Sequence, residues 1–240
     1  PRMTELGIPV FNAPGANANA VKELVLAGML LAARNIAQSW LFARGLSGAD
    51  GEINRAVESG KKAFVGFELP GRTLGVIGLG AIGVLVANAA RALGMRVIGY
   101  DPTITVQRAW QLESDVQPAV SVDDLLSRSD FVTFHVPLTD ETRHMINAER
   151  LRTMKKGSVL LNFARHGIID DAAAVAALDS GQLYAYICDF PSNLLKDHPR
   201  VVTLPHLGAS TREAEENCAV MVADQVREYL EDGNVHNAVN

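Results

Sequence analysis

Short apolar runs recur from residue 74 onward, and stretches with helical character lie between them. Apolar runs without in-and-out alternation are typical of strands that are covered on both faces, as in a parallel sheet. We predict strands at 74–77, 96–100, 131–134, 158–161, 184–187 and 201–204, and helices at 81–93, 121–127, 147–154, 171–180 and 211–230. This alternation indicates an α/β fold, a doubly wound parallel sheet of the Rossmann type with about six core strands.

The ends of several predicted helices carry recognisable signals. Ser121 and Asp170 stand where a side chain can cap a helix N-terminus, and either Ser210 or Thr211 can do so ahead of the last helix. Gly94 directly follows the helix that ends at residue 93, as a stop signal should.

The first 70 residues differ in character from the rest of the chain. They hold a short predicted strand at 8–11 and a predicted helix at about 19–40 that is apolar almost all the way round. A helix without a polar face must be covered on every side, and the charge-free stretch 24–33 is too short to span a bilayer. We expect this helix to lie between the domain and a partner subunit, in a homodimer or higher homo-oligomer. A central helix of a monomer is the alternative.

The composition is that of an ordinary globular protein, with 240 residues of which 48% are hydrophobic and 20% charged. A net charge of −5 without any basic run argues against nucleic-acid partners and against a basic membrane-surface protein. Cys188 and Cys218 form neither a disulfide framework nor a zinc spacing, so we predict no metal site and a cytoplasmic location. Glycines interrupt the apolar run 73–90, which we interpret as strand, turn and helix rather than a membrane span.

The segment Gly-Leu-Gly-Ala-Ile-Gly follows the first core strand and opens a predicted helix. In this G-x-G-x-x-G pattern, Gly78 would form the tight turn, Gly80 would let the backbone approach a pyrophosphate, and Gly83 would let helix and strand pack closely. The helix N-terminus, with Ala81 and Ile82 in its first turn, would face the anion. The pattern therefore predicts a dinucleotide site.

Asp101 ends the second predicted strand, 21 residues after Gly80. Its carboxylate can accept hydrogen bonds from both ribose hydroxyls and would repel a 2′-phosphate. This spacing predicts NAD rather than NADP as the cofactor. A capping or turn role for Asp101 before Pro102 is the alternative, and a flavin remains possible on the same fold.

Three polar residues follow predicted strands, at the carboxyl ends where open α/β sheets bind ligands. His135 and His206 each follow an apolar strand, and histidine is the side chain suited to proton exchange near neutral pH. Arg165 follows the strand that ends near Asn162, where its guanidinium can meet a carboxylate with two hydrogen bonds. For each of the three, a solvated loop residue is an equally open interpretation.

Four segments resemble, in order and spacing, the D-isomer-specific 2-hydroxyacid dehydrogenases. They are residues 71–83 around the glycines, 135–139 (HVPLT), 162–170 (NFARHGIID) and 205–211 (PHLGAST). Further segments resemble the members of this family that oxidise 3-phospho-D-glycerate, namely 11–14 with 21–25 and 206–217 with 237–240. The resemblance covers essentially the whole chain. It implies an NAD-dependent enzyme that oxidises a small-molecule 2-hydroxy acid.

The resemblance also implies roles for single residues. Arg165 would hold the substrate carboxylate and keto oxygen, and His206 would exchange the hydroxyl proton. Asp189, at the end of the fifth predicted strand, would bind the nicotinamide carboxamide, and residues 135–137 would line the adenine side. The implied cofactor site comprises Gly78, Gly80, Ala81, Ile82, Gly83, Asp101, His135, Val136, Pro137, Ala164, Asp189, His206 and Gly208.

The chain departs from the family pattern in one catalytic element. The family normally places a Glu shortly after the Asp189 position, where it pairs with the histidine, yet no Glu lies between Arg165 and His206 here. Asn193 can hydrogen-bond the imidazole but cannot stabilise its charged form as a carboxylate would, and Asp197 is a possible substitute. We therefore expect His206 to hold its proton less strongly than in relatives that carry the Glu.

We predict that residues 1–240 form a single NAD-binding domain, with 1–70 as a linking strand and helical dimerisation arm and 71–240 as the Rossmann core. Family members carry a substrate domain ahead of this region, and the chain starts at Pro1, so we expect that domain to be absent from this chain. The chain would then bind NAD but turn over substrate poorly by itself. Two other interpretations stay open: a substrate of the glycerate, lactate or hydroxyphenylpyruvate type, and an NAD-sensing dimeric regulatory protein.

Overall fold

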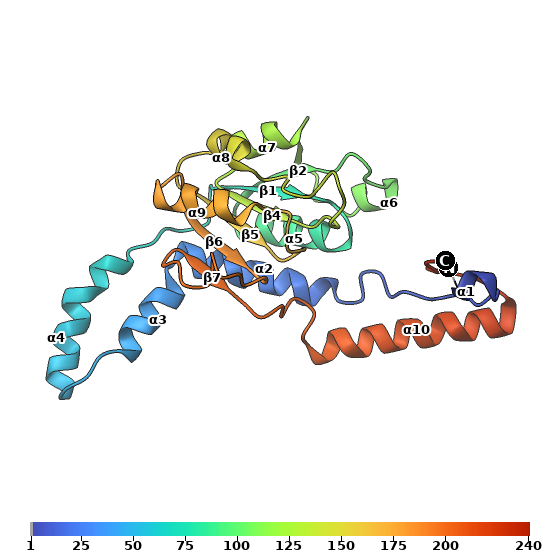
Figure 1. Cartoon of the computed structure of the whole chain (residues 1–240), viewed down its shortest axis with the longest axis horizontal. Helices are drawn as coiled ribbons and strands as arrows, with labels where there is room; N and C mark the ends of the chain where they lie inside the picture. The colour runs from blue at the N-terminus through green and yellow to red at the C-terminus, as the bar shows by residue number, and fades with distance from the viewer. Residues whose placement is uncertain (1) are drawn as a thin grey trace.

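A seven-stranded sheet, parallel at every strand pair, forms the centre of the computed structural model, which describes residues 2–240 (Figure 1). The strands are β1 (Thr73–Ile77), β2 (Arg96–Tyr100), β3 (Gln117–Pro118), β4 (Phe131–Phe134), β5 (Ser158–Asn162), β6 (Leu183–Cys188) and β7 (Val201–Thr203). Their order is β3-β2-β1-β4-β5-β6-β7, so the chain moves outward from β1 in one direction and from β4 in the other. The predicted doubly wound sheet is confirmed, with the short edge strand β3 added to the six predicted strands.

Helices on both faces connect these strands. They are α5 (Ala81–Ala92), α6 (Val106–Ala109), α7 (Val122–Arg128), α8 (Ala148–Thr153) and α9 (Asp171–Asp179). The predicted caps are confirmed: the side chains of Ser121 and Asp170 accept hydrogen bonds from the N–H groups of Asp124 and Ala173. Gly94, after α5, has a φ of 80°, which glycine adopts readily.

The sheet is buried on both faces, which explains its continuous apolar runs. Every residue of β1, β4 and β5 is buried. On one face, Leu125 of α7 and Leu151 of α8 belong to a core cluster with Leu160 of β5. On the other face, α5 and the N-terminal helix α2 (Ala18–Ala33) form a second cluster, to which Met29 belongs. Burial of such side chains stabilises the fold by roughly 1.5–3 kcal/mol each.

The single long helix predicted at 19–40 is wrong, because the structure divides it. α2 ends at Ala33, and α3 (Ile36–Arg44) begins directly after Asn35. The φ of Asn35, 50°, is left-handed. Asparagine enters this region more readily than most residues. Its Oδ1 accepts hydrogen bonds from the Tyr184 hydroxyl at 2.9 Å and from Arg200 Nη1 at 3.3 Å. The break is therefore fixed by polar contacts with a half-buried tyrosine and an exposed arginine, which an apolar pattern does not reveal.

Within residues 2–240 this segment is covered only in part, and its cover by a partner subunit stays a prediction. Leu30 of α2 remains 43% exposed, and α3 has no buried residue. A loop joins α3 to α4 (Asp50–Gly60), which is followed by the 3₁₀ turn η1 (Lys61–Phe64). Neither α4 nor η1 was predicted. The segment 36–64, here called the arm hairpin, projects from the sheet at one end of the molecule (Figure 1).

At the opposite end, α10 (Arg212–Asp232) projects away from the sheet, with α1 (Arg2–Glu5) beside its far end (Figure 1). The strand predicted at 8–11 is reduced to one antiparallel bridge, between Phe11 and Ala238. The two ends of the chain thus pair with each other rather than with the sheet. No helix within residues 2–240 has the length and hydropathy needed to cross a membrane.

Candidate active site

The glycine-rich turn joins β1 to α5. Gly78 has a φ of 91°, and a Cβ on Gly83 would lie 1.9 Å from the Gly78 carbonyl oxygen, so both positions require glycine. A Cβ on Gly80, in contrast, would meet no protein atom within 4 Å. This open space lies at the N-terminus of α5, which starts at Ala81 and whose first N–H groups have no intrahelical partner. The free N–H groups and the open space beside Gly80 are the features that an anion-binding helix N-terminus needs.

Asp101 lies directly after β2 and contacts this turn. Its Oδ2 accepts the Leu79 N–H at 2.8 Å, and its Oδ1 accepts the N–H and hydroxyl of Thr103 at 2.9 and 3.0 Å. Beside it opens a hollow of about 410 Å³ whose lining includes the apolar side chains of Ile104 and Val116. Asp101 thus makes the turn contacts of the alternative interpretation, while a carboxylate keeps further lone pairs for ribose hydroxyls.

A second pocket, of about 280 Å³, opens beside the carboxyl ends of β4 and β5 and the first turn of α5. This is where the strand order reverses, the usual ligand site of such sheets. Eight predicted site residues line it: Ile82, His135, Val136, Pro137, Ala164, Arg165, His206 and Gly208. Four further lining residues were not predicted: Asn17, Val21, Phe163 and Ala209. Of these, Asn17 and Val21 come from the start of α2, which no strand-end motif would indicate.

Arg165 stands in the loop after β5, with its side chain exposed at the pocket. Asn162, the last residue of β5, holds this loop from within the core. The Asn162 Oδ1 accepts the Ala164 N–H at 3.2 Å, and its Nδ2 donates to the Arg165 carbonyl at 3.0 Å. The guanidinium is therefore carried by a fixed backbone, in a position to meet a carboxylate.

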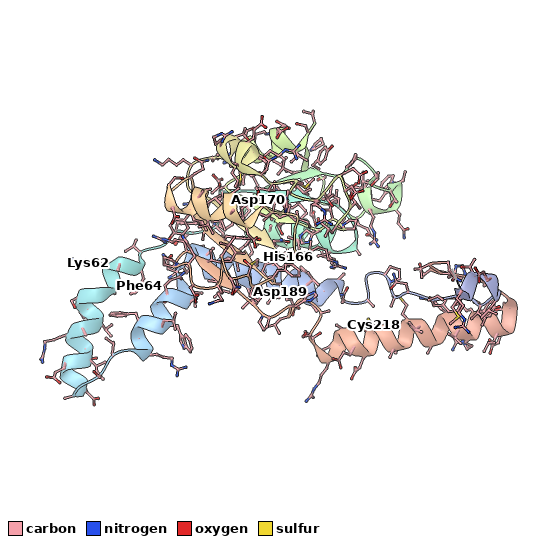
Figure 2. The ribbon with its side chains drawn as sticks, in the orientation of Figure 1. Lys62, Phe64, His166, Asp170, Asp189 and Cys218 are labelled. Carbon is pink, nitrogen blue, oxygen red and sulfur yellow. The ribbon has the colours of Figure 1, made fainter. Side chains whose placement is uncertain are left out.

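His206 stands in the loop after β7, in left-handed conformation with a φ of 56°. Asp189, directly after β6, holds this loop. The Asp189 carbonyl accepts the His206 N–H at 3.1 Å, its Oδ1 the Leu207 N–H at 2.9 Å and its Oδ2 the Gly208 N–H at 2.8 Å. Asp189 is only 1% exposed and does not line the pocket. Figure 2 shows it in the central body of the molecule, whereas Cys218 lies on the projecting α10.

The two candidate histidines have different surroundings. The Nε2 of His135 lies 3.1 Å from the Thr133 hydroxyl, and its Nδ1 is buried without a hydrogen-bond partner among residues 2–240. Burial lowers the pKa of His135 to about 3, so this imidazole is neutral near pH 7. His206 is exposed at the pocket. The geometry therefore favours His206 over His135 for proton exchange.

The role of residues 135–137 on the adenine side stays a prediction. They line the pocket that holds Arg165 and His206 and not the hollow beside Asp101.

No carboxylate forms an ion pair with His206 in the part of the chain from residue 2 to 240. Asp197, named above as a possible substitute, is exposed and pairs with Lys196. The His206 ring instead lies near Phe190, with ring centroids 5.2 Å apart. Among the same residues, no cluster of His, Cys, Asp or Glu is arranged to hold a metal ion.

A doubly wound parallel sheet, a glycine-rich turn after its first strand and a carboxylate after its second together define a dinucleotide-binding domain. Comparison with known proteins narrows this class to a family. The family described as "D-isomer specific 2-hydroxyacid dehydrogenase, NAD binding domain" matches residues 27–208. The chain belongs to this family, and NAD is the cofactor of the family.

Single relatives agree with this assignment. The D-3-phosphoglycerate dehydrogenase of Methanocaldococcus jannaschii is 42% identical over 99% of this chain, which spans only 44% of that relative's length. A solved glyoxylate reductase from Paecilomyes thermophila is 32% identical with a TM-score of 0.82, and it covers 99% of this chain, which covers 70% of it. The apo D-mandelate dehydrogenase of Rhodotorula graminis is 27% identical with a TM-score of 0.87 and the same coverage.

Proposed function

We propose that this chain is the cofactor-binding domain of an NAD-dependent dehydrogenase that oxidises 3-phospho-D-glycerate to 3-phosphohydroxypyruvate, the first step of serine biosynthesis. The observation that carries the proposal is the pocket lined by Arg165, His206 and Ile82, the last of which lies in the first turn of α5. An arginine and a histidine from separate loops supply the two groups that oxidation of a 2-hydroxy acid needs. The choice of substrate rests on the relatives named D-3-phosphoglycerate dehydrogenase.

In this proposal each residue has one task. Arg165 binds the substrate carboxylate through two parallel N–H···O bonds, which fixes the neighbouring hydroxyl-bearing carbon. An unprotonated nitrogen of His206 accepts the hydroxyl proton as the C–H bond gives up its hydride. Bound NAD⁺ supplies the hydride acceptor. The products are the 2-oxo acid, NADH and a proton on His206 that passes to solvent.

We further propose that the substrate domain lies outside this chain and that residues 1–70 serve dimerisation. The arm hairpin supports the second point, because Ile36, Trp40 and Leu41 of α3 are 43, 55 and 63% exposed. Large apolar side chains on a projecting element indicate a surface that another subunit covers. A second copy of this chain is the occupant that the symmetry of most oligomers favours. The cytoplasmic location stays a prediction.

A regulatory, NAD-sensing protein is the second candidate. The observation that favours it is the lack of a carboxylate paired with His206 within residues 2–240. Such a protein would bind NADH without turning over any hydroxy acid. The pocket position of both Arg165 and His206 supports the enzyme instead, because a sensor needs neither group.

An activity panel tests these proposals. A protein that includes the region ahead of this chain is assayed with NAD⁺ and NADP⁺ against 3-phospho-D-glycerate, D-glycerate, D-lactate and hydroxyphenyllactate, following the absorbance of the reduced cofactor. We expect the highest kcat/KM for 3-phospho-D-glycerate with NAD⁺. Preference for another acid would overturn the substrate, and NADH binding without any turnover would favour the sensor. The 240-residue chain alone should bind NADH and turn over little.

A further inference from the structure

Asn162 is a buried polar residue at the end of β5, only 1% exposed, and it does not line the pocket. Its side-chain amide bonds two consecutive residues of the neighbouring loop. The Oδ1 accepts the Ala164 N–H at 3.2 Å, and the Nδ2 donates to the Arg165 carbonyl at 3.0 Å. The Nδ2 also lies 3.5 Å from the Tyr186 hydroxyl. Both ends of the amide are therefore used, as a buried polar group requires.

The backbone of Asn162 is linked, through Asp189, to the loop that holds His206. Its carbonyl accepts the Asp189 N–H at 3.1 Å, because β5 and β6 end side by side. Asp189 in turn accepts the N–H groups of His206, Leu207 and Gly208, at 3.1, 2.9 and 2.8 Å. Asn162 and Asp189 are each 1% exposed. A short hydrogen-bonded chain, anchored in the core, thus joins the Arg165 loop to the His206 loop.

We propose that Asn162 is a positioning residue that fixes Arg165 relative to His206, so that a carboxylate and the hydroxyl beside it meet both groups at once. The inference rests on the proposed function, which gives Arg165 the carboxylate. A small displacement of a positioning group weakens such two-point binding strongly. Arg165 is exposed, and among residues 2–240 its guanidinium has one hydrogen-bond partner, the Ala164 carbonyl, which accepts from Nη1 at 2.6 Å. The backbone contacts of Asn162 therefore set the place of this residue.

The chemistry of the contact requires an amide. Its Oδ1 must accept from Ala164 while its Nδ2 donates to Arg165, and asparagine offers both on one planar group. An aspartate of the same shape keeps the acceptor and loses the donor. An alanine loses both. The two replacements therefore separate the two halves of the contact.

A purely structural role for Asn162 is the competing explanation, in which it only completes the core beside Tyr186. Two control variants address this. Tyr186→Phe removes the hydroxyl that lies 3.5 Å from Nδ2. Ser158→Ala alters another buried polar residue of β5, whose Oγ has no hydrogen-bond partner among residues 2–240.

The first measurement is amide hydrogen exchange on the cofactor-free chain. In Asn162→Ala the Ala164 N–H should exchange at least tenfold faster than in the wild type, whereas in Asn162→Asp it should stay within about threefold. Interior amides of β5 should keep their protection in both variants, as they should in Ser158→Ala. Unchanged exchange at Ala164 in Asn162→Ala would overturn the proposal whatever the function of the pocket.

The second measurement is binding of oxamate, a carboxylate analogue of a 2-oxo acid, to the NADH-loaded chain by calorimetry. We expect both Asn162 variants to bind oxamate about tenfold more weakly, with NADH affinity within twofold of the wild type. Both control variants should bind both ligands normally. Asn162→Asp combined with Arg165→Ala should lose no more than Arg165→Ala alone, because the two residues act on one contact.

These outcomes separate the positioning role of Asn162 from the proposed function of the pocket. If Arg165→Ala leaves oxamate binding unchanged, the proposed function fails and the exchange data alone decide the place of Asn162. If the wild-type chain binds no oxamate without its substrate domain, the exchange data again decide the place of Asn162, and the activity panel decides the proposed function. If Arg165→Ala weakens oxamate binding but both Asn162 variants bind it normally, the positioning role fails and the proposed function stands. Loss of NADH affinity in parallel with oxamate affinity would indicate a general structural defect and also overturn the positioning role. If one Asn162 variant does not fold, the other carries the binding test.

Discussion

The three glycines between β1 and α5 meet different steric demands. Gly83 is closed by the protein itself, since a Cβ there would lie 1.9 Å from the Gly78 carbonyl oxygen. Gly80 is open, since a Cβ there would meet nothing within 4 Å. The space at Gly80 is therefore left for something other than protein, which is where the account places the pyrophosphate.

This difference predicts opposite effects for two matched substitutions. Gly83→Ala should destabilise the fold by about 1–3 kcal/mol, because helix and strand must move apart. Gly80→Ala should change stability by less than about 1 kcal/mol, since its φ of −75° suits alanine. It should nevertheless weaken NADH binding at least tenfold. Thermal unfolding measures the stability of both variants, and NADH titration measures their affinity. Normal NADH affinity in Gly80→Ala would contradict the placement of the pyrophosphate at Gly80.

His135 predicts a pH dependence of stability. Burial lowers the pKa of His135 from 6.5 to about 3, so below pH 6.5 the unfolded chain binds a proton there that the folded chain does not. The stability that this histidine contributes is present above pH 6.5 and is lost as the pH falls toward 3. His135→Gln should therefore lose less free energy of unfolding between pH 6.5 and about 4 than the wild type. Urea unfolding at several pH values tests this, with the exposed His236→Gln as control; parallel curves for all three would contradict it.

The site residues that were predictable from the sequence are those whose position depends only on the neighbouring strand. Gly78 directly follows β1 and Arg165 lies three residues after the end of β5, so their place at the carboxyl edge of the sheet was predictable from spacing. Asn162 was not identified, because its importance depends on where the loop after its own strand turns back. Asp189 was found, but its contact with the His206 loop was not, since that loop belongs to β7, farther along the chain.

At the scale of elements, the division between α2 and α3 shows what an apolar pattern omits. Apolar residues resume directly after Arg34 and Asn35, so the pattern alone does not mark a break there. The residues that fix the break, Tyr184 and Arg200, lie 149 and 165 positions further along the chain. The core strands were predictable because they are covered on both faces. β3, whose two residues are exposed, lacks the apolar pattern that would reveal it. α4 was not predicted although Ile53, Ala56 and Val57 stand at helical spacing, and it buries none of its residues.

Two substitutions at Asn35 separate its backbone from its side chain. Asn35→Gly keeps easy access to a φ of 50° but loses the bonds to Tyr184 and Arg200, whereas Asn35→Ala loses the same bonds and adds backbone strain. Both variants should be less stable than the wild type, and Asn35→Ala should be less stable than Asn35→Gly by about 1–2 kcal/mol. Denaturant unfolding measures the difference. Equal stability of the two variants would show that the left-handed conformation does not fix the break.

At the scale of the whole molecule, the sheet carries two projecting ends, the arm hairpin and α10 (Figure 1). We predict that the arm hairpin mediates self-association. Trp40→Glu places a charge on its 55% exposed apolar face and should convert a dimer to a monomer in light scattering after size exclusion. Val106→Glu, at a 75% exposed apolar position of α6, is the matched control and should leave the dimer intact. A monomeric wild type, or an unchanged mass for Trp40→Glu, would contradict the prediction.

Two hollows lie at the carboxyl edge of the sheet. We propose that the hollow beside Asp101 takes an adenosine and that the pocket with Arg165 and His206 takes a nicotinamide and its substrate. The open N-terminus of α5 beside Gly80 would then take the pyrophosphate between them. One extended dinucleotide is the ligand that uses all three features.

A crystal structure of the chain with NADH tests this claim most directly. The account predicts the pyrophosphate over Gly80, the adenosine ribose hydroxyls at the Asp101 carboxylate, and the nicotinamide ring in the pocket with Arg165 and His206 on either side of its reactive face. NADH bound elsewhere, or bound with its nicotinamide turned away from Arg165 and His206, would contradict it.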